Sequence, residues 1–244
     1  MSSDSVEAVQ SLILRRVWSS LWTHLPLLAL SAAVTTVAAA VASATGAAVP
    51  GGLLTPVLLA LLAGPTLMAL VRVVQGALVE DDTDLRMYLS SLRSTAVRSA
   101  GIAFVPAICL VSLLAALDVY GRTGSGVMLV SLCLAAVASV LTVAGTVVLL
   151  PLVVARPALR GARVWAISWH LLGRWPMRFL APLALAALAL WAAVSFASTL
   201  VLLLPAPIAL LAGAAYWCCA VELGAEDVDG AGSVREDLTS APRS

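Results

Sequence analysis

Two apolar runs follow one another in the sequence: residues 25–49, LPLLALSAAVTTVAAAVASATGAAV, and residues 53–71, LLTPVLLALLAGPTLMALV, on either side of Pro50-Gly51-Gly52. No Asp, Glu, Lys or Arg lies between Arg16 and Arg72, an interval of 55 residues. A helix of about 20 apolar residues crosses a membrane, because the hydrocarbon layer is about 30 Å thick and each residue rises about 1.5 Å. The interval therefore predicts two membrane spans joined by a turn at the helix-breaking tripeptide.

The composition of the whole chain agrees with this prediction. Of the 244 residues, 61% are hydrophobic and 11% are charged, the net charge is +1 and the mean hydropathy is +1.04. An ordinary soluble domain has about 25% charged residues and about half apolar residues. The composition excludes a water-soluble globular enzyme, a disordered chain and a nucleic-acid-binding protein. It predicts an all-α fold, a polytopic bundle of transmembrane helices.

Four further spans follow from the other intervals without charged residues. The third and fourth flank Gly124-Ser125-Gly126, and the fifth and sixth form a tight hairpin that turns near residues 198–207. The last interval leaves little room for a connection, so a single span is the alternative there. The six predicted spans lie at about 25–46, 53–75, 100–118, 126–152, 179–198 and 202–221. They form a membrane domain over residues 23–221, between a cytoplasmic amphipathic helix at 1–22 and a disordered acidic cytoplasmic tail at 222–244.

The arginines predict the orientation of the bundle. All 14 basic residues are arginines, and 13 of them fall on one side of the membrane, so that only Arg122 falls on the other. Basic residues in short loops concentrate on the cytoplasmic side. Both termini are therefore expected in the cytoplasm. Arginine without lysine, together with abundant Ala, Val and Leu, is typical of a GC-rich bacterial genome, which indicates a multi-pass protein of the bacterial plasma membrane.

Amphipathic segments precede spans on the predicted cytoplasmic side, at residues 6–21, 83–99 and 157–175. Tryptophans gather at the same face, as expected for rings anchored at the level of the lipid headgroups: Trp18, Trp22, Trp165, Trp169 and Trp175. These segments predict an inner-face surface that contacts anionic lipid or a partner. Its candidate residues are Arg15, Arg16, Arg93, Arg98, Arg160, Arg163, Arg174, Arg178, Trp165 and Trp169.

Ionisable residues are rare within the predicted spans, where burial of charge is costly and marks ion or proton pathways. Asp118 and Arg122 predict an ion pair at the outer rim. His24 and His170 lie at the cytoplasmic boundary without a second ligand at metal-like spacing, and the four cysteines match no zinc pattern. The sequence therefore predicts no catalytic residue, no cofactor and no metal site.

Prolines interrupt two of the predicted spans. Gly64 and Pro65 lie in the second span, and Pro106 lies in the third. A proline within a helix removes a hydrogen bond and frees a carbonyl that neighbouring groups must satisfy. These helix-kink positions predict fixed bends, with a hinge as the alternative.

One stretch carries a family resemblance. Leu62-Ala63-Gly64-Pro65-Thr66-Leu67-Met68-Ala69-Leu70-Val71-Arg72 is followed by the acidic turn Glu80-Asp81-Asp82 and by Tyr88 in an amphipathic helix. This order resembles, as a distant match, the second span and the following helix of the YesL-like family of bacterial integral membrane proteins. The helix with Trp18 before the first span and the basic helix at 158–178 before the last hairpin also fit.

The resemblance implies a role without an established biochemical activity. The association of that family with carbohydrate uptake implies an accessory protein beside the subunits of a sugar importer. The first hypothesis is therefore a non-catalytic membrane protein with the lipid bilayer and importer subunits as partners. A transporter or permease for a small solute is the alternative. A lipid-modifying enzyme would need an acid–base pair. Asp118 is predicted on the opposite side of the membrane from His24 and His170, so these residues cannot form one.

Overall fold

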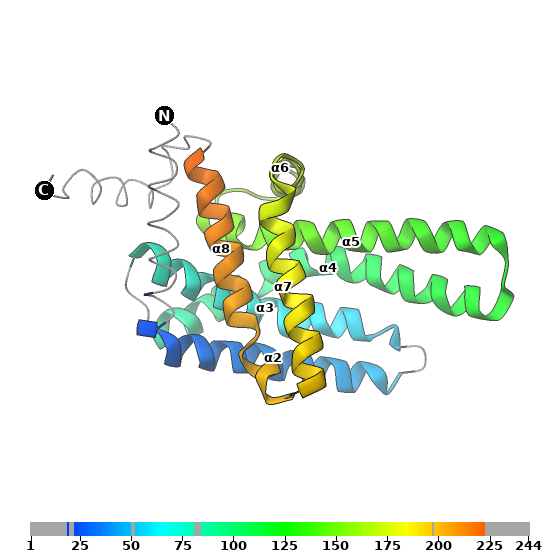
Figure 1. Cartoon of the computed structure of the whole chain (residues 1–244), viewed down its shortest axis with the longest axis horizontal. Coiled ribbons are helices and arrows are strands. Elements are labelled where there is room, and N and C mark those ends of the chain that lie inside the picture. Colours follow the sequence, from blue (N-terminus) through cyan, green and yellow to red (C-terminus); the bar gives the residue numbers. More distant parts are fainter. Residues whose placement is uncertain (1–18, 20–21, 50–51, 81–83, 197, 223–244) are drawn as a thin grey trace, which may run out of the picture.

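The computed structural model describes residues 19, 22–49, 52–80, 84–196 and 198–222, and within these ranges the chain forms helices and no strand (Figure 1). The prediction of an all-α fold is confirmed for this part of the chain. The elements are α2 (Leu25–Ala47), α3 (Thr55–Gln75), the π-helix η2 (Gly76–Glu80), α4 (Leu85–Thr123), α5 (Gly126–Ala155), α6 (Ala162–Arg174), α7 (Pro176–Phe196), the 3-10 helix η3 (Ser198–Leu203) and α8 (Pro205–Glu222).

The first four long helices form two hairpins, α2 with α3 and α4 with α5, which pack against each other through α3 and α4 (Figure 1). Glycines with positive φ angles lie in both connections, at Gly52 (63°) and Gly124 (60°). Such angles suit glycine, which has no Cβ to clash with the backbone. The predicted turn at Gly124-Ser125-Gly126 is confirmed, whereas residues 50 and 51 of the other turn lie outside the described residues.

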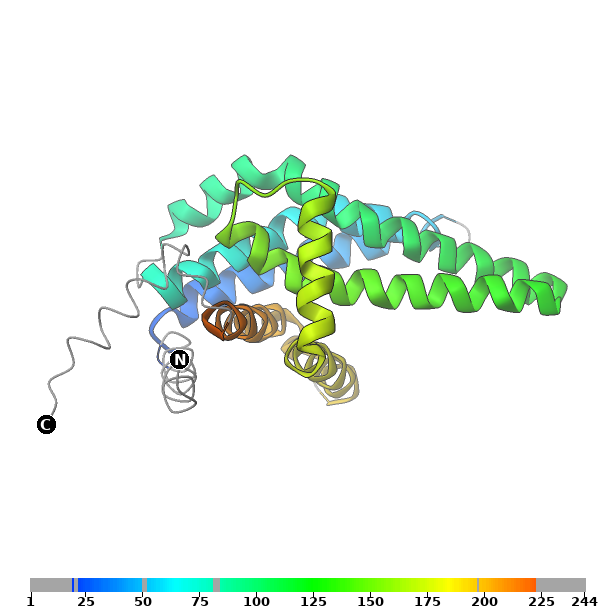
Figure 2. The same ribbon diagram turned by 90° about the horizontal axis from the view of Figure 1, so that it is seen from above.

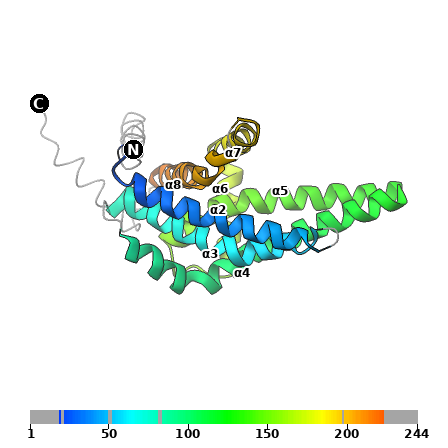
Figure 3. The ribbon, with the colours of Figure 1, turned by 90° about the horizontal axis from the view of Figure 1, so that it is seen from below.

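Helix α4 joins two elements that the sequence analysis predicted separately. The amphipathic segment 83–99 and the span 100–118 belong to one helix of 39 residues, which bends along its length (Figures 2 and 3). No proline or positive-φ glycine separates the two parts, so the backbone hydrogen bonds continue through them. A helix of this length extends about 58 Å, nearly twice the thickness of the hydrocarbon layer. Its first part therefore extends beyond any bilayer that its second part crosses.

The packed core lies around the end of α3 that carries Arg72. Met68, Leu70 and Val74 of this helix are buried together with side chains of α2, α5 and α8. Farther along the hairpin, α5 leaves apolar side chains exposed, and Val140 for example is 66% exposed. An apolar exterior of this kind suits contact with lipid.

The last hairpin lies across the other helices rather than alongside them: α7 and α8 cross α2, α3 and α5 (Figure 1). Its tip is η3, where the Thr36 hydroxyl donates to the carbonyls of Val201 and Leu202 at 3.3 and 3.4 Å. Thr36 lies in the middle of α2, about 16 Å before the end of that helix at Ala47. The hairpin expected from the sequence is therefore present, with its turn at η3 inside the predicted range 198–207, and its crosswise position is a feature that the sequence analysis did not predict.

Five helical segments within the described ranges are long and apolar enough to cross a membrane. They are Leu25–Ala47, Thr55–Leu78, Leu85–Thr123, Gly126–Ala155 and Val201–Ala220. The apolar part of α7, Pro176–Ala189, is too short to cross a membrane. The prediction of several helices that could cross a membrane is thus confirmed for the described residues, and the count of six spans is not.

Candidate functional site

Helix α6 lies crosswise on α5 (Figures 1 and 2). Its buried side chains are Val164, Ser168 and Leu171, whose spacing places them on one helical face. The Ser168 hydroxyl donates to the carbonyl of Gly145 at 2.7 Å. The amphipathic helix expected in segment 157–175 is therefore present, and it docks on α5 through its apolar face.

Gly145 allows α6 to approach α5 closely. A Cβ at this position would lie 3.0 Å from Nε1 of Trp169 and 3.2 Å from Cζ3 of Trp165. The centroids of the two indole rings are 6.0 Å apart and the ring planes are 60° apart, a geometry typical of packed aromatic pairs. The structure thus brings two predicted inner-face residues together over a glycine that the sequence analysis did not single out.

Part of the surface of α6 is exposed and carries basic side chains. Arg163 and Arg174 are exposed, and Trp169, which contacts α5 at Gly145, is still 51% exposed. The guanidinium carbon of Arg174 lies 4.9 Å from the centre of the Trp175 ring, within the range of a cation–π contact. This face offers cations and aromatic rings to a neighbouring surface.

Arg98 links the amphipathic part of α4 to the segment that precedes α6. Its Nη1 donates to the Pro157 carbonyl at 2.8 Å, and its Nη2 donates to the Leu159 carbonyl. Both acceptors are neutral, so these bonds orient the guanidinium without cancelling its charge. Arg160 follows Leu159 directly and adds a second positive charge nearby. This part of the site is therefore electropositive.

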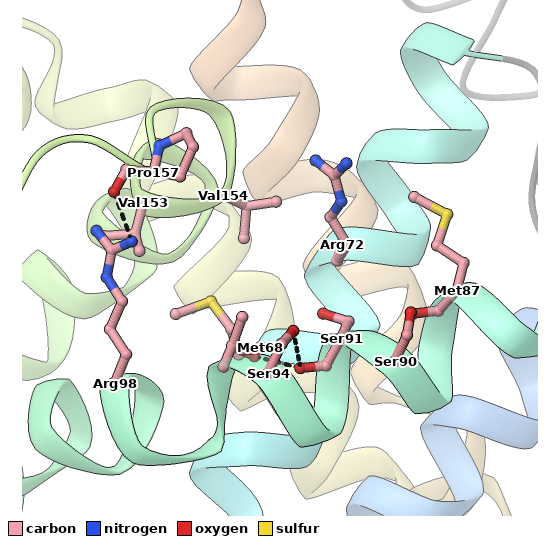
Figure 4. Close-up of a pocket in the computed structure, with 11 residues that line it drawn as sticks. Met68, Arg72, Met87, Ser90, Ser91, Ser94, Arg98, Val153, Val154 and Pro157 are labelled. Atoms are coloured by element: carbon pink, nitrogen blue, oxygen red, sulfur yellow. Dashed lines mark hydrogen bonds between the residues drawn. The ribbon is translucent and has the colours of Figure 1, made fainter.

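A pocket of about 340 Å³ opens beside Arg98 (Figure 4). Arg98 lies toward one end of it and Met87 toward the other, and Ser91 and Ser94 of α4 lie between Arg98 and Arg72 (Figure 4). No acidic residue is among the described side chains that line the pocket. These are Met68, Arg72, Met87, Ser90, Ser91, Ser94, Thr95, Arg98, Val153, Val154 and Pro157.

Arg98 belongs to the inner-face surface predicted from the sequence, whereas the pocket beside it was not predicted. Its signal is the recurrence of hydroxyl residues at 90, 91, 94 and 95, positions that share one face of a helix. That pattern cannot reveal the opposite wall, which comes from α3 and from the end of α5.

The other predicted inner-face residues lie in different surroundings. Arg15 and Arg16 lie outside the described residues. Arg93 and Arg160 are exposed, and Arg93 is not part of the pocket. Arg178 is half-buried, with its Nη1 3.8 Å from Sγ of Cys219 on α8. The structure therefore does not gather the eight candidates of the described ranges into one site.

The predicted kink positions lie within continuous helices. α3 continues past Pro65, and α4 continues past Pro106. Gly64 has a packing role, because a Cβ there would lie 3.1 Å from Cβ of Ala103 on α4. Pro151, near the end of the predicted fourth span at 126–152, lies inside α5, which continues to Ala155. Both the fixed bends and the alternative hinge stay predictions.

Two further predictions concern polar side chains: an ion pair between Asp118 and Arg122, and the lack of a metal site. Asp118 and Arg122 form the predicted ion pair near the end of α4, with Oδ2 and Nη2 2.9 Å apart, so this prediction is confirmed. In the described ranges no three side chains of His, Cys, Asp or Glu come together in a way that could hold a metal ion.

Gln75 is a polar residue of the core that the sequence analysis overlooked. Its side chain is 4% exposed, and Nε2 donates to the Pro151 carbonyl at 3.0 Å. The bond joins the end of α3 to α5 within the packed core. A search for charged residues cannot find it, because the amide carries no charge.

No protein-family model, curated protein or solved structure matches the chain. The resemblance to the YesL-like family and the functions that it implies therefore stay predictions.

Proposed function

We propose that the chain is a non-catalytic integral membrane protein of the bacterial plasma membrane, accessory to carbohydrate uptake, which presents α6 to a subunit of a sugar importer. The five long apolar helical segments support the membrane setting. The YesL-like resemblance is the reason for choosing a sugar importer as the partner.

The position of α6 on α5 is the observation that carries this proposal. α6 crosses α5 at Gly145, about 28 Å along the helix from Gly126, and this distance is close to the thickness of the hydrocarbon layer. With the start of α5 at the outer surface, α6 lies in the headgroup region of the inner leaflet. Tryptophan and arginine side chains are favoured in that region.

The orientation follows the same argument. The hairpins α2–α3 and α4–α5 cross the bilayer with their arginine-bearing ends in the cytoplasm, and both chain termini lie on that side. Six spans require α7 to cross as well. The helix has 21 residues, of which the apolar part Pro176–Ala189 is shorter than a span, and it packs against α5 and α8.

The exposed face of α6 suits a protein partner with an acidic surface. Arg163, Trp169 and Arg174 combine the residue types that contribute most to binding energy at protein interfaces. The apolar face of the helix is already occupied by α5, so the exposed face is the one available to a partner.

Affinity purification of the full chain from membranes solubilised in a mild detergent tests this role. We expect importer subunits to be recovered with the wild-type chain and to fall by about tenfold or more with the double variant Arg163→Glu and Arg174→Glu. Arg122→Glu, at the predicted outer rim, is the matched control and should leave recovery unchanged. Recovery of the chain without an importer subunit would contradict the accessory role.

A transporter for a small solute is the second candidate, and the pocket beside Arg98 favours it. Purified chain in proteoliposomes separates the two roles. Flux of a sugar or a sugar phosphate through the purified chain would exclude a purely accessory function.

A further inference from the structure

We propose that the pocket between α3, α4 and the end of α5 binds the phosphate group of a small phosphate ester. The inference goes beyond the proposed function, because it concerns a ligand of this chain and requires no importer. Three features support it: the charge of the pocket, its hydroxyl groups and its apolar wall.

The charge comes from Arg98 and Arg72, which line the pocket from α4 and α3 (Figure 4). Arg98 is held in place by the carbonyls of Pro157 and Leu159, so its orientation is set before a ligand arrives. A guanidinium presents several N–H donors in a planar arrangement that matches phosphate oxygens. Two such groups suit an anion with several charged oxygens better than a monoanionic carboxylate.

The hydroxyl groups add donors along the α4 wall. Ser90 donates to the Met87 carbonyl at 3.1 Å, and Ser94 and Thr95 donate to the Ser91 carbonyl at 3.3 and 2.7 Å. A carbonyl inside a helix already accepts a backbone bond, so these hydroxyls can rotate and donate to an anion instead. They would contact phosphate oxygens that the guanidinium groups leave uncovered.

The size and the remaining wall indicate an ester rather than free phosphate alone. The volume of about 340 Å³ lies at the lower end of the range for small-molecule sites. Met68, Val153 and Val154 form an apolar side that can contact the carbon part of a ligand. A phospholipid headgroup and a soluble phosphorylated molecule share this chemistry.

Thermal unfolding of the purified full chain in non-ionic detergent, followed by tryptophan fluorescence, tests the proposal and distinguishes the two sources. The soluble probe is glucose 6-phosphate, the lipid probe is dihexanoylphosphatidylglycerol, and glucose is the uncharged control. All titrations are made at one ionic strength. We expect at least one phosphate probe to raise the unfolding temperature in a saturable way, and the probe that does so identifies the source.

Two variants connect the effect to the pocket. Arg98→Gln removes one charged donor and is expected to weaken binding roughly 10- to 100-fold. Because Arg98 also holds the segment before α6, Ser94→Glu is the second variant. It places a carboxylate on an exposed position of α4, where the helix can accept it, and should weaken binding at least as much. Arg122→Gln removes the same charge at the predicted outer rim and should bind normally.

The proposal is overturned if neither phosphate probe shifts the unfolding temperature, or if glucose shifts it equally. It is also overturned if Ser94→Glu retains the full response, whatever the behaviour of Arg98→Gln. These outcomes are independent of the affinity purification, so the failure of one proposal leaves the other standing.

Discussion

Replacing Gln75 with glutamate is expected to destabilise the folded chain by about 3 to 5 kcal/mol, the usual cost of leaving a buried charge without a partner. Gln75 is 4% exposed, and its amide donates to the Pro151 carbonyl at 3.0 Å. A carboxylate of the same size cannot donate that bond, and it places negative charge against the carbonyl oxygen. The loss should appear as a lower midpoint of unfolding in detergent micelles.

Gln75→Met is the matched control for this prediction. It keeps a similar volume and removes the donor without adding charge. The Pro151 carbonyl lies within α5, where it can keep a backbone partner, so we expect a loss of only about 1 kcal/mol. Equal losses for the two variants would show that Gln75 is not enclosed as the structure has it.

Gly46→Ala is expected to destabilise the α2–α3 hairpin by about 1 to 3 kcal/mol, the range for overpacking of a tight contact. A Cβ at position 46 would lie 2.5 Å from Cα of Thr55, far closer than van der Waals contact. Because the obstruction is backbone, a change of side-chain rotamer cannot relieve it, and the two helices must separate. Unfolding midpoints of the purified variants measure the loss.

The control for this prediction is Gly121→Ala. Gly121 lies in α4 with no heavy atom within 4 Å of an added Cβ. Alanine favours a helix by about 1 kcal/mol relative to glycine, so this variant should be as stable as the original chain or more so. A loss in Gly121→Ala as large as that in Gly46→Ala would exclude the close approach at Thr55 as the cause.

The helices could be predicted from the sequence because their signals are local. Intervals without charge and turns with glycine placed α2, α3 and α5 within a few residues of their observed bounds. The joining of segment 83–99 to the following span could not be predicted. The first part mixes polar and apolar residues and the second part is largely apolar, so the sequence pattern suggests two elements. The helix nevertheless continues, because no residue that ends a helix lies between them.

The crosswise position of α7 and α8 could not be predicted from hydropathy. An apolar helix has the same sequence pattern whether it lies along its neighbours or across them. The contact of Thr36 with Val201 joins residues 165 positions apart. Such contacts depend on packing, for which the sequence offers no periodic signal.

The candidate site was predictable only in part, because some of its residues have a distinctive type and their partners do not. Arg98, Trp165 and Trp169 were identified by residue type and by their place beside predicted spans. Their partners, the Pro157 carbonyl and Gly145, come from other elements and carry no distinguishing chemistry of their own. The pocket exists only because three elements meet, so residue type alone indicates one of its walls.

The central claim is that the two hairpins α2–α3 and α4–α5 cross a bilayer with their arginine-bearing ends in the cytoplasm. Fusions of alkaline phosphatase and of green fluorescent protein after Gly124 and after Ala158 test it most directly. We expect active phosphatase and no fluorescence after Gly124, and fluorescence without phosphatase activity after Ala158. The same reporter active at both positions would contradict the claim, because the 30 residues of α5 would then not cross the membrane.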